Sequence, residues 1–127
     1  MASVMIVDDS VTSRRFLRKM IEESRKHTVA CEAVNGEEAV RKYKNFSPDI
    51  VTMDIAMPLM NGVYATVEIL KYDPGATIIM VSSMSDKNLV VTAMKRGAKS
   101  YMLKPVENDK LLNTLEQVLN DNADSQN

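Results

Sequence analysis

The sequence has little of several residue types on which whole classes of protein depend. Of its 127 residues, one is a cysteine, one is a histidine, four are glycines and none is a tryptophan. The single cysteine, Cys31, cannot form an internal disulfide, and we expect it to be a small buried apolar side chain. The lone histidine, His27, stands beside Lys26 in an expected loop. One histidine leaves too few ligands for a typical zinc site and argues against a serine–histidine triad.

An excess of one charge and long apolar runs are also missing. The formal net charge is −1, from 16 basic and 17 acidic side chains, which gives no support to binding of nucleic acid or of an anionic membrane surface. No apolar run is long enough to cross a bilayer, and we find no signal peptide, so we expect a cytoplasmic protein. With 45% hydrophobic and 26% charged residues, the chain has the composition of an ordinary globular domain.

Short apolar runs alternate with helical patterns along the chain. The apolar runs predict five strands, at Ser3–Val7, Val29–Val34, Asp49–Met53, Ala76–Val81 and Lys99–Leu103. The expected helices run from Thr12 to Arg25, from the capping residue Asn35 to about Asn45, from the Asn61-Gly62 turn to Asp73, from the capping residue Asp86 to Gly97, and from about Glu107 to Leu119. This alternation predicts an α/β fold with a parallel sheet covered on both faces.

The chain has room for one domain, which we expect to span residues 1–120 and to be followed by a polar tail at residues 121–127. On the first helix, Phe16, Leu17 and Met20 belong to an apolar stripe that we expect to face the core. Arg14 lies on the same helix, where it either meets a partner protein or belongs to a solvated charged face.

Polar side chains follow four of the predicted strands at the point where each strand ends. Asp8 and Asp9 follow the first strand, Asp54 the third, Ser82 the fourth and Lys104 the fifth. Because ligands of open parallel sheets bind at the carboxyl ends of the strands, we expect these side chains to converge at one edge.

Three carboxylates at one edge require a positive partner. Helix capping accounts for one aspartate of the Asp8–Asp9 pair, but not for two that face a third on another strand. Ionised carboxylates a few ångströms apart repel one another, so one becomes protonated or a cation binds. Mg2+ suits a few carboxylates together with phosphate oxygens, and a carboxylate beside it can attack a phosphoryl group. Lys104 and Ser82, otherwise an ordinary solvated lysine and a turn serine, would then be a fixed cation and a hydroxyl donor.

Four segments carry a resemblance to one family. They are Ile6–Ser10, Met53–Gly62, Val81–Ser83 and Tyr101–Pro105. In this order, and across nearly the whole chain, they resemble the receiver domains of bacterial two-component response regulators, most closely the single-domain chemotaxis type. The resemblance implies a flavodoxin-like (βα)5 fold with strand order 2-1-3-4-5, for which the chemotaxis receiver is itself a standard example.

The resemblance also implies roles for the acidic residues. Asp54 matches the residue that accepts the phosphoryl group. Asp9, Asp54 and the backbone carbonyl of Ala56 match direct ligands of Mg2+, and Asp8 matches a ligand that acts through water.

The resemblance further implies a conformational switch. Lys104 matches a lysine that contacts the phosphoryl group, and its bond to Pro105 is expected to be cis. Ser82 and Tyr101 match a hydroxyl–aromatic pair that moves inward on phosphorylation. That movement remodels the face made by the fourth helix, the fifth strand and the fifth helix, which binds the target.

We therefore expect a stand-alone, monomeric receiver that is phosphorylated on Asp54 by a sensor histidine kinase, with chemotaxis as its pathway. The expected partners are that kinase, a target protein such as the flagellar motor switch, and a phosphatase. Such a protein assists its own phosphorylation and dephosphorylation but is a switch rather than an enzyme. Because Ala56 and Met84 are apolar where the family tunes attack by water, we also expect slow decay of the phosphorylated state.

Two alternatives remain. A phosphorelay intermediate would pass its phosphoryl group to a histidine phosphotransfer protein, and the sequence does not separate this function from chemotaxis. A phosphohydrolase with an aspartyl-phosphate intermediate is less favoured. Enzymes that resemble haloacid dehalogenases carry a second aspartate two positions after the nucleophile, where this chain has Ala56, and need a substrate cap.

Overall fold

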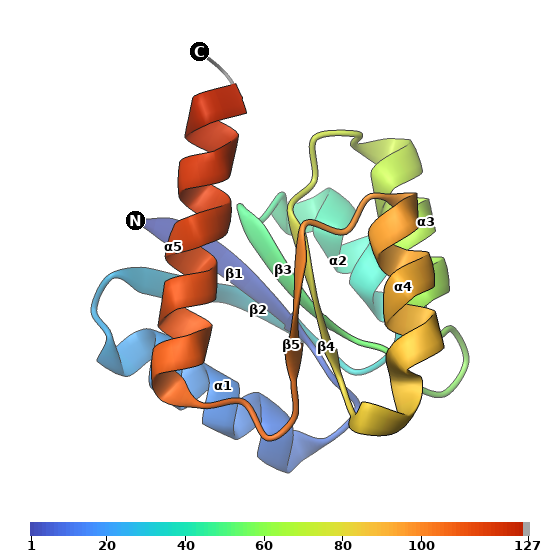
Figure 1. The fold of residues 1–127 in the computed structure, drawn as a ribbon, viewed down its shortest axis with the longest axis horizontal. Coiled ribbons are helices and arrows are strands. Elements are labelled where there is room, and N and C mark those ends of the chain that lie inside the picture. The colour runs from blue at the N-terminus through green and yellow to red at the C-terminus, as the bar shows by residue number, and fades with distance from the viewer. Residues whose placement is uncertain (126–127) are drawn as a thin grey trace.

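Five parallel strands form the centre of the molecule, and helices cover both faces (Figure 1). The computed structural model describes residues 1–125. The strands are β1 (Ala2–Val7), β2 (His27–Ala33), β3 (Ile50–Asp54), β4 (Ile78–Ser82) and β5 (Ser100–Leu103). The helices are α1 (Val11–Glu23), α2 (Gly36–Phe46), α3 (Gly62–Tyr72), α4 (Lys87–Arg96) and α5 (Asn108–Ser125), with a 3-10 turn, η1 (Met84–Asp86), before α4. The strand order is β2-β1-β3-β4-β5, which confirms the predicted fold and order.

The sheet has an apolar core on each face because successive strand residues point to opposite sides. Helices α2, α3 and α4 cover one face, where Met5, Met53 and Met80 are buried with Ile69 of α3. Helices α1 and α5 cover the other face, where the side chains are mainly aliphatic. That second core contains Val4, Ile6, Ile50, Ile79, Leu17, Ile21, Leu111 and Leu115. Since the strands are parallel, all five carboxyl ends lie at the same edge of the sheet.

Side-chain caps set where several helices begin, and thereby fix the loops after the strands. The Asn35 side chain accepts a hydrogen bond from the backbone N–H of Glu38 at 2.8 Å, as predicted. Gly97 ends α4 with a φ of 122°, a left-handed conformation that favours glycine. Asp86 stands at the start of α4 but does not cap it. Its carboxylate instead accepts a hydrogen bond from the Ser83 hydroxyl at 3.1 Å.

Three further expectations were wrong. Phe16 is 63% exposed and does not face the core, because the buried stripe of α1 is centred on Leu17 and Ile21. His27 is the buried first residue of β2 rather than part of a loop, and its Nδ1 accepts the backbone N–H of Ala2 at 3.2 Å. Helix α5 continues past the predicted end to Ser125, so most of the predicted polar tail is helical, and residues 126–127 of that tail lie outside the described residues.

Cys31 is buried, as expected. Among residues 1–125, none of the helices combines the length and the apolar character that crossing a membrane requires.

We predict that the substitution Thr52→Val stabilises the protein. Thr52 is 1% exposed between Ile6 of β1 and Ile79 of β4, and its hydroxyl has no hydrogen-bond partner among the described residues. Replacing this unpaired hydroxyl by a methyl group should raise the free energy of unfolding in urea by about 1 kcal/mol. Thr114→Val is the control, because the buried Thr114 hydroxyl donates to the Lys110 carbonyl at 2.7 Å. Equal losses of stability in the two variants would contradict the prediction.

Candidate functional site

Side chains from four strand ends meet at the carboxyl edge of the sheet. Asp8 and Asp9 follow β1, Asp54 ends β3, Ser82 ends β4 and Lys104 follows β5. One carboxylate oxygen from each of the three aspartates lies within 4.8 Å of the other two. Asp8 and Asp54 are buried, whereas Asp9 is exposed. The structure thus brings together the three carboxylates that the strand ends predicted.

Lys104 provides the positive charge of the cluster. Its Nζ donates to Asp8 Oδ2 at 3.0 Å and lies 3.3 Å from Asp54 Oδ1. Burial lowers the pKa of Lys104, but hydrogen bonds and charges from Asp8 and Asp54 outweigh it and raise that pKa above its ordinary value. Lys104 therefore stays protonated between the two buried carboxylates. The peptide bond from Lys104 to Pro105 is cis, as the resemblance implied.

The environment of Asp54 opposes its ionisation. Burial raises the pKa of Asp54 to about 6, and the charge of Asp8 adds to the shift, while Lys104 acts in the opposite direction. The Asp54 Oδ1 atom also accepts the backbone N–H of Ile55 at 3.0 Å. A divalent cation beside Asp54 would favour its ionised form.

The loop after β3 packs closely against Asp54. The backbone N–H of Gly62 donates to the Ile55 carbonyl at 2.9 Å, and this contact closes the loop. A Cβ atom at Gly62 would lie 2.0 Å from the Asp54 carbonyl oxygen, so no larger residue fits there. Ala56, two residues after Asp54, is exposed on the same loop.

Ser82 is buried beside the cluster without satisfying its hydroxyl. The residue is 0% exposed, and its Oγ atom has no hydrogen-bond partner among the described residues. A groove of about 560 Å3 adjoins Ser82, with Tyr101, Val90 and Met94 among its lining residues. Tyr101, which lines this groove, is 48% exposed. The buried hydroxyl is therefore available to an incoming oxygen, and the groove adjoins both members of the predicted switch pair.

The donor set fits a hard divalent cation. Three carboxylates offer oxygen ligands within 4.8 Å of one another, and the single ammonium of Lys104 offsets only part of their charge. The unpaired Ser82 hydroxyl and the Lys104 ammonium are donors suited to an anion next to such a cation.

Comparison with known proteins decides the family. The family model for the response regulator receiver domain matches residues 4–116. This chain belongs to that family. The chemotaxis protein CheY of Thermotoga maritima is 47% identical to it over 115 residues, which cover 91% of this chain and 95% of that protein. CheY of Bacillus subtilis is 42% identical over 117 residues, which cover 92% and 97% of the two chains.

Solved structures agree with this family. The response regulator domain of Thermotoga maritima CheB matches this receiver with a TM-score of 0.86 at 33% identity, over 93% of this chain and 96% of that one. A complex of CheX, CheY, BeF3 and Mg2+ from Borrelia burgdorferi contains a chain that matches with a TM-score of 0.85 at 39% identity, over 92% and 88%. The arrangement of strands and helices in this receiver is thus that of the family.

Some contacts of the receiver site were not predicted from the sequence. The guanidinium of Arg14 donates to the backbone carbonyl of Asp8 at 2.7 Å, and the backbone N–H of Ser10 donates to Asp8 Oδ1 at 2.8 Å. The Ser10 side chain also caps α1, and a serine directly before a helical pattern is a usable signal for that cap. The reach of Arg14 depends on how α1 packs against the sheet, for which the sequence offers no comparable signal.

We predict that Asp54→Asn stabilises the metal-free receiver in a pH-dependent way. Because folding raises the pKa of Asp54 from 3.8 to about 6, this group favours the folded state most below pH 4 and loses that contribution as the pH rises through 6. Asparagine does not titrate, so the stability advantage of the variant should grow between pH 4 and pH 7, by about 2–3 kcal/mol. Urea unfolding in EDTA across this range measures it. An advantage that does not change with pH would contradict the assignment.

Proposed function

We propose that this receiver is a signalling switch that accepts a phosphoryl group on Asp54 from a phosphohistidine of a sensor kinase. The observation that carries the proposal is a buried carboxylate, Asp54, placed against the ammonium of Lys104 and beside two further carboxylates. A purely structural ion pair does not explain why three carboxylates surround one ammonium. A site that binds a metal ion and then a phosphoryl group does explain it, because the extra carboxylates are ligands of the metal.

Asp9, Asp54 and the carbonyl of Ala56 would hold Mg2+ directly, and Asp8 would hold it through water. When bound, Mg2+ supplies positive charge that neutralises the oxygens of the transferring phosphoryl group. An oxygen of Asp54 attacks the phosphorus. A bond forms between that oxygen and phosphorus as the bond from phosphorus to the donor imidazole nitrogen breaks. The imidazole keeps the electron pair and takes up a proton from solvent.

The other residues of the site act on the phosphoryl oxygens. Lys104 turns its ammonium from the two carboxylates toward the new anion, whose charge it offsets. The Ser82 hydroxyl, which lacks a partner among the described residues, donates to another oxygen. The same groups assist later loss of the phosphoryl group to water, so the chain is a switch that promotes its own chemistry rather than an enzyme with a separate substrate.

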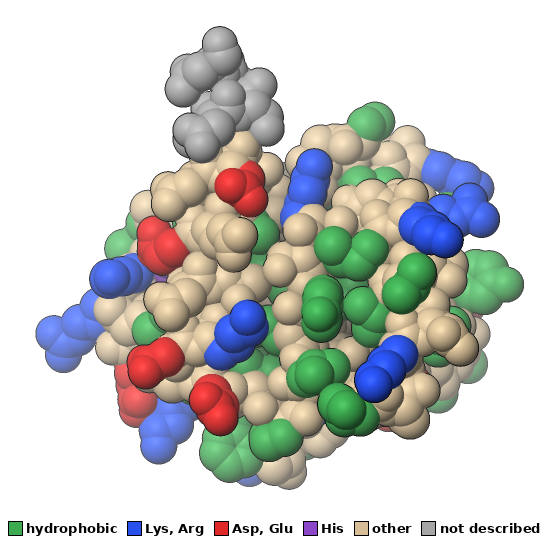
Figure 2. Space-filling model, in the orientation of Figure 1, with side chains coloured by type: hydrophobic (Ala, Val, Ile, Leu, Met, Phe, Trp, Pro, Cys, Tyr) green, Lys and Arg blue, Asp and Glu red, His purple; other side chains and the backbone are tan. Residues whose placement is uncertain are grey.

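The switch acts on the surface formed by α4, β5 and α5. Figure 2 shows apolar side chains gathered where α4 and β5 lie in Figure 1. The exposed apolar residues of these two elements are Leu89, Val91, Tyr101 and Leu103. Once Ser82 turns toward the phosphoryl group, the ring of Tyr101 moves into the adjoining groove, and the apolar surface changes shape. A target protein that prefers one shape of this surface then reports the phosphorylation state.

Chemotaxis is the pathway that the relatives favour. Several chemotaxis CheY proteins are 40–47% identical to this chain, and the chain spans 95% of the Thermotoga protein and 97% of the Bacillus protein. The matches thus extend over nearly the full length of those CheY proteins, which supports a function of the same kind. The flagellar motor switch is then the expected target, and the receiver is expected to act in the cytoplasm. The Borrelia complex of CheY with CheX provides a precedent for a second partner.

The central prediction is phosphorylation of one carboxylate. Incubation of the receiver with Mg2+ and acetyl phosphate should add one phosphoryl group, which hydroxylamine removes because an acyl phosphate is labile to it. Mass analysis should detect no such group in Asp54→Asn or when EDTA replaces Mg2+. Thr52→Val serves as a folded control that keeps the site. Modification that persists in Asp54→Asn would show that another residue is the acceptor.

A second prediction concerns the lifetime of the phosphoryl group. Ala56 and Met84 are exposed, lie two positions after Asp54 and Ser82 in the sequence, and have no polar side-chain group that could orient an attacking water. The double variant Ala56→Asn, Met84→Glu should lose its phosphoryl group faster, by about tenfold or more, because the new side chains can orient or activate that water. The apolar pair Ala56→Val, Met84→Leu is the matched control. Decay that is equal to wild type or slower in the polar variant would defeat the idea.

A further inference from the structure

We infer that Arg14 is a positioning residue of the receiver site, which fixes the backbone of the loop that carries Asp8 and Asp9 and is itself held by Glu32. The inference deepens the proposed function, because it concerns the residues proposed to hold Mg2+. The side chain of Arg14 contacts the backbone of Asp8 and the carboxylate of Glu32, but no carboxylate oxygen of Asp8, Asp9 or Asp54, so its influence on the metal site is indirect.

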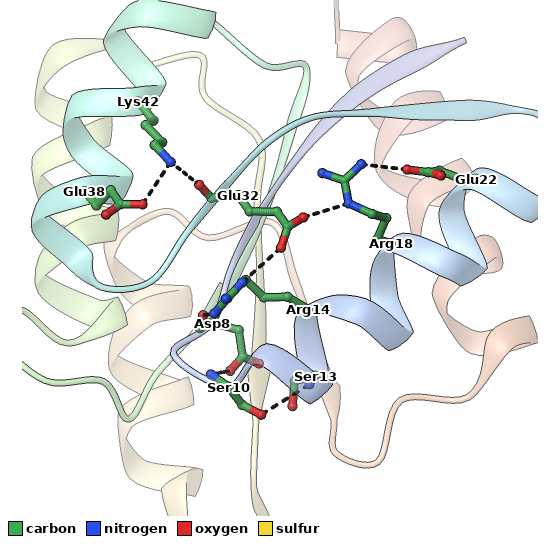
Figure 3. A network of polar contacts seen from close by, with 9 residues as sticks. All are labelled: Asp8, Ser10, Ser13, Arg14, Arg18, Glu22, Glu32, Glu38 and Lys42. Atoms are coloured by element: carbon green, nitrogen blue, oxygen red, sulfur yellow. Dashed lines mark hydrogen bonds and ion pairs between the residues drawn. The ribbon is translucent and has the colours of Figure 1, made fainter.

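Two contacts use the planar geometry of the Arg14 guanidinium. Its Nη1 donates to the Asp8 carbonyl at 2.7 Å, and its Nε donates to Glu32 Oε1 at 2.9 Å (Figure 3). The side chain of Arg14 is only 13% exposed. The guanidinium therefore joins the loop after β1 to the edge strand β2 through two donors of one rigid group.

The Asp8 carbonyl is a sensitive point because β1 ends just before it. The Asp8 N–H donates to the Ala33 carbonyl of β2 at 3.0 Å, and this hydrogen bond fixes the peptide unit before Asp8. The Asp8 carbonyl belongs to the peptide unit that leads to Asp9. The carboxylate of Asp9 is exposed, and no residue in the described part of the chain donates a hydrogen bond to it. The direction in which Asp9 enters the cluster therefore depends on the backbone that Arg14 fixes.

Glu32 keeps the guanidinium in place by sharing its carboxylate between two arginines. Its Oε2 accepts from Arg18 Nε at 2.7 Å, and Arg18 also reaches Glu22 at 2.6 Å. Lys42 of α2 donates to the Glu32 carbonyl at 2.6 Å and pairs with Glu38 at 2.9 Å. The network thus ties α1, β2 and α2 to the acidic loop (Figure 3).

The charges of this network are balanced, so its effect on the site is geometric rather than electrostatic. Arg14, Arg18 and Lys42 face three glutamates. Arg18 shares the same Glu32 carboxylate with Arg14 and lies one helical turn further along α1, but it makes no contact with Asp8. If the network only stabilised the fold, substitutions of Arg14 and Arg18 would affect the acidic loop equally. A positioning role predicts a larger effect for Arg14.

The test compares Arg14→Lys with Arg18→Lys. Lysine keeps the positive charge, but its single ammonium cannot replace a planar guanidinium whose separate nitrogens donate to the Asp8 carbonyl and to Glu32. Titration calorimetry with Mg2+ at fixed pH and ionic strength should show weaker binding to Arg14→Lys, by about tenfold, and a change within about twofold for Arg18→Lys. Glu32→Gln should also weaken Mg2+ binding, because the glutamine side chain has one acceptor oxygen for two arginines.

A measurement without metal checks the same inference. The Ser10 amide donates to Asp8 Oδ1, so its hydrogen exchange in EDTA reports the order of the acidic loop. Exchange should be faster in Arg14→Lys than in Arg18→Lys, while urea unfolding should give similar free energies for the two variants.

Equal Mg2+ affinity and equal Ser10 exchange in the two lysine variants would overturn the positioning role. Loss of Mg2+ affinity in proportion to lost stability in both variants would overturn it as well. Failure of the proposed function gives different results. The wild-type receiver would then bind no Mg2+ or would not be phosphorylated on Asp54, while faster Ser10 exchange in Arg14→Lys would still support the placement of the loop by Arg14.

Discussion

Repulsion among Asp8, Asp9 and Asp54 is partly offset by the ammonium of Lys104, which lies 3.0 Å from Asp8 and 3.3 Å from Asp54. Burial makes this arrangement costly, and the pKa of Asp54 rises to about 6 as a result. The fold tolerates the cost because both apolar cores and the parallel ladder stabilise the strands whose ends carry these residues. A bound cation would neutralise the excess negative charge of the carboxylates, and a phosphoryl group would then give Lys104 and Ser82 new partners. Chemistry at the site is thereby coupled to the conformation around it.

The parallel sheet is what allows this cluster to form from distant parts of the chain. Strands β1, β3, β4 and β5 deliver their ends to one edge, and close packing of Gly62 against Asp54 shapes the loop between them. The groove beside Ser82 extends the site toward Tyr101 and the apolar surface of α4 and β5. Ser82, at the end of β4, therefore links the acidic cluster to the surface proposed to bind the target.

Much of this arrangement could be predicted because it depends on local patterns. Strands buried on both faces have apolar runs that end sharply at polar residues, so the fold and the convergence of Asp8, Asp9 and Asp54 followed from the sequence. Other features depend on tertiary packing. The exposure of Phe16 depends on the rotation of α1 about its axis, and the burial of His27 depends on partners in β1 and α5, Ala2 and Glu116. The contact of Arg14 with Asp8 likewise required the packed helix.

The dependence of stability on Mg2+ tests the electrostatic account most directly. Urea unfolding of the wild-type receiver should give a higher free energy with Mg2+ than with EDTA at matched ionic strength, by about 2.7 kcal/mol when the metal is present at 100 times its dissociation constant. Asp9→Asn should lose most of that gain, since it removes one carboxylate from the cluster without disturbing the cores. A wild-type stability that is the same with Mg2+ and with EDTA, or a gain that is undiminished in Asp9→Asn, would contradict the account.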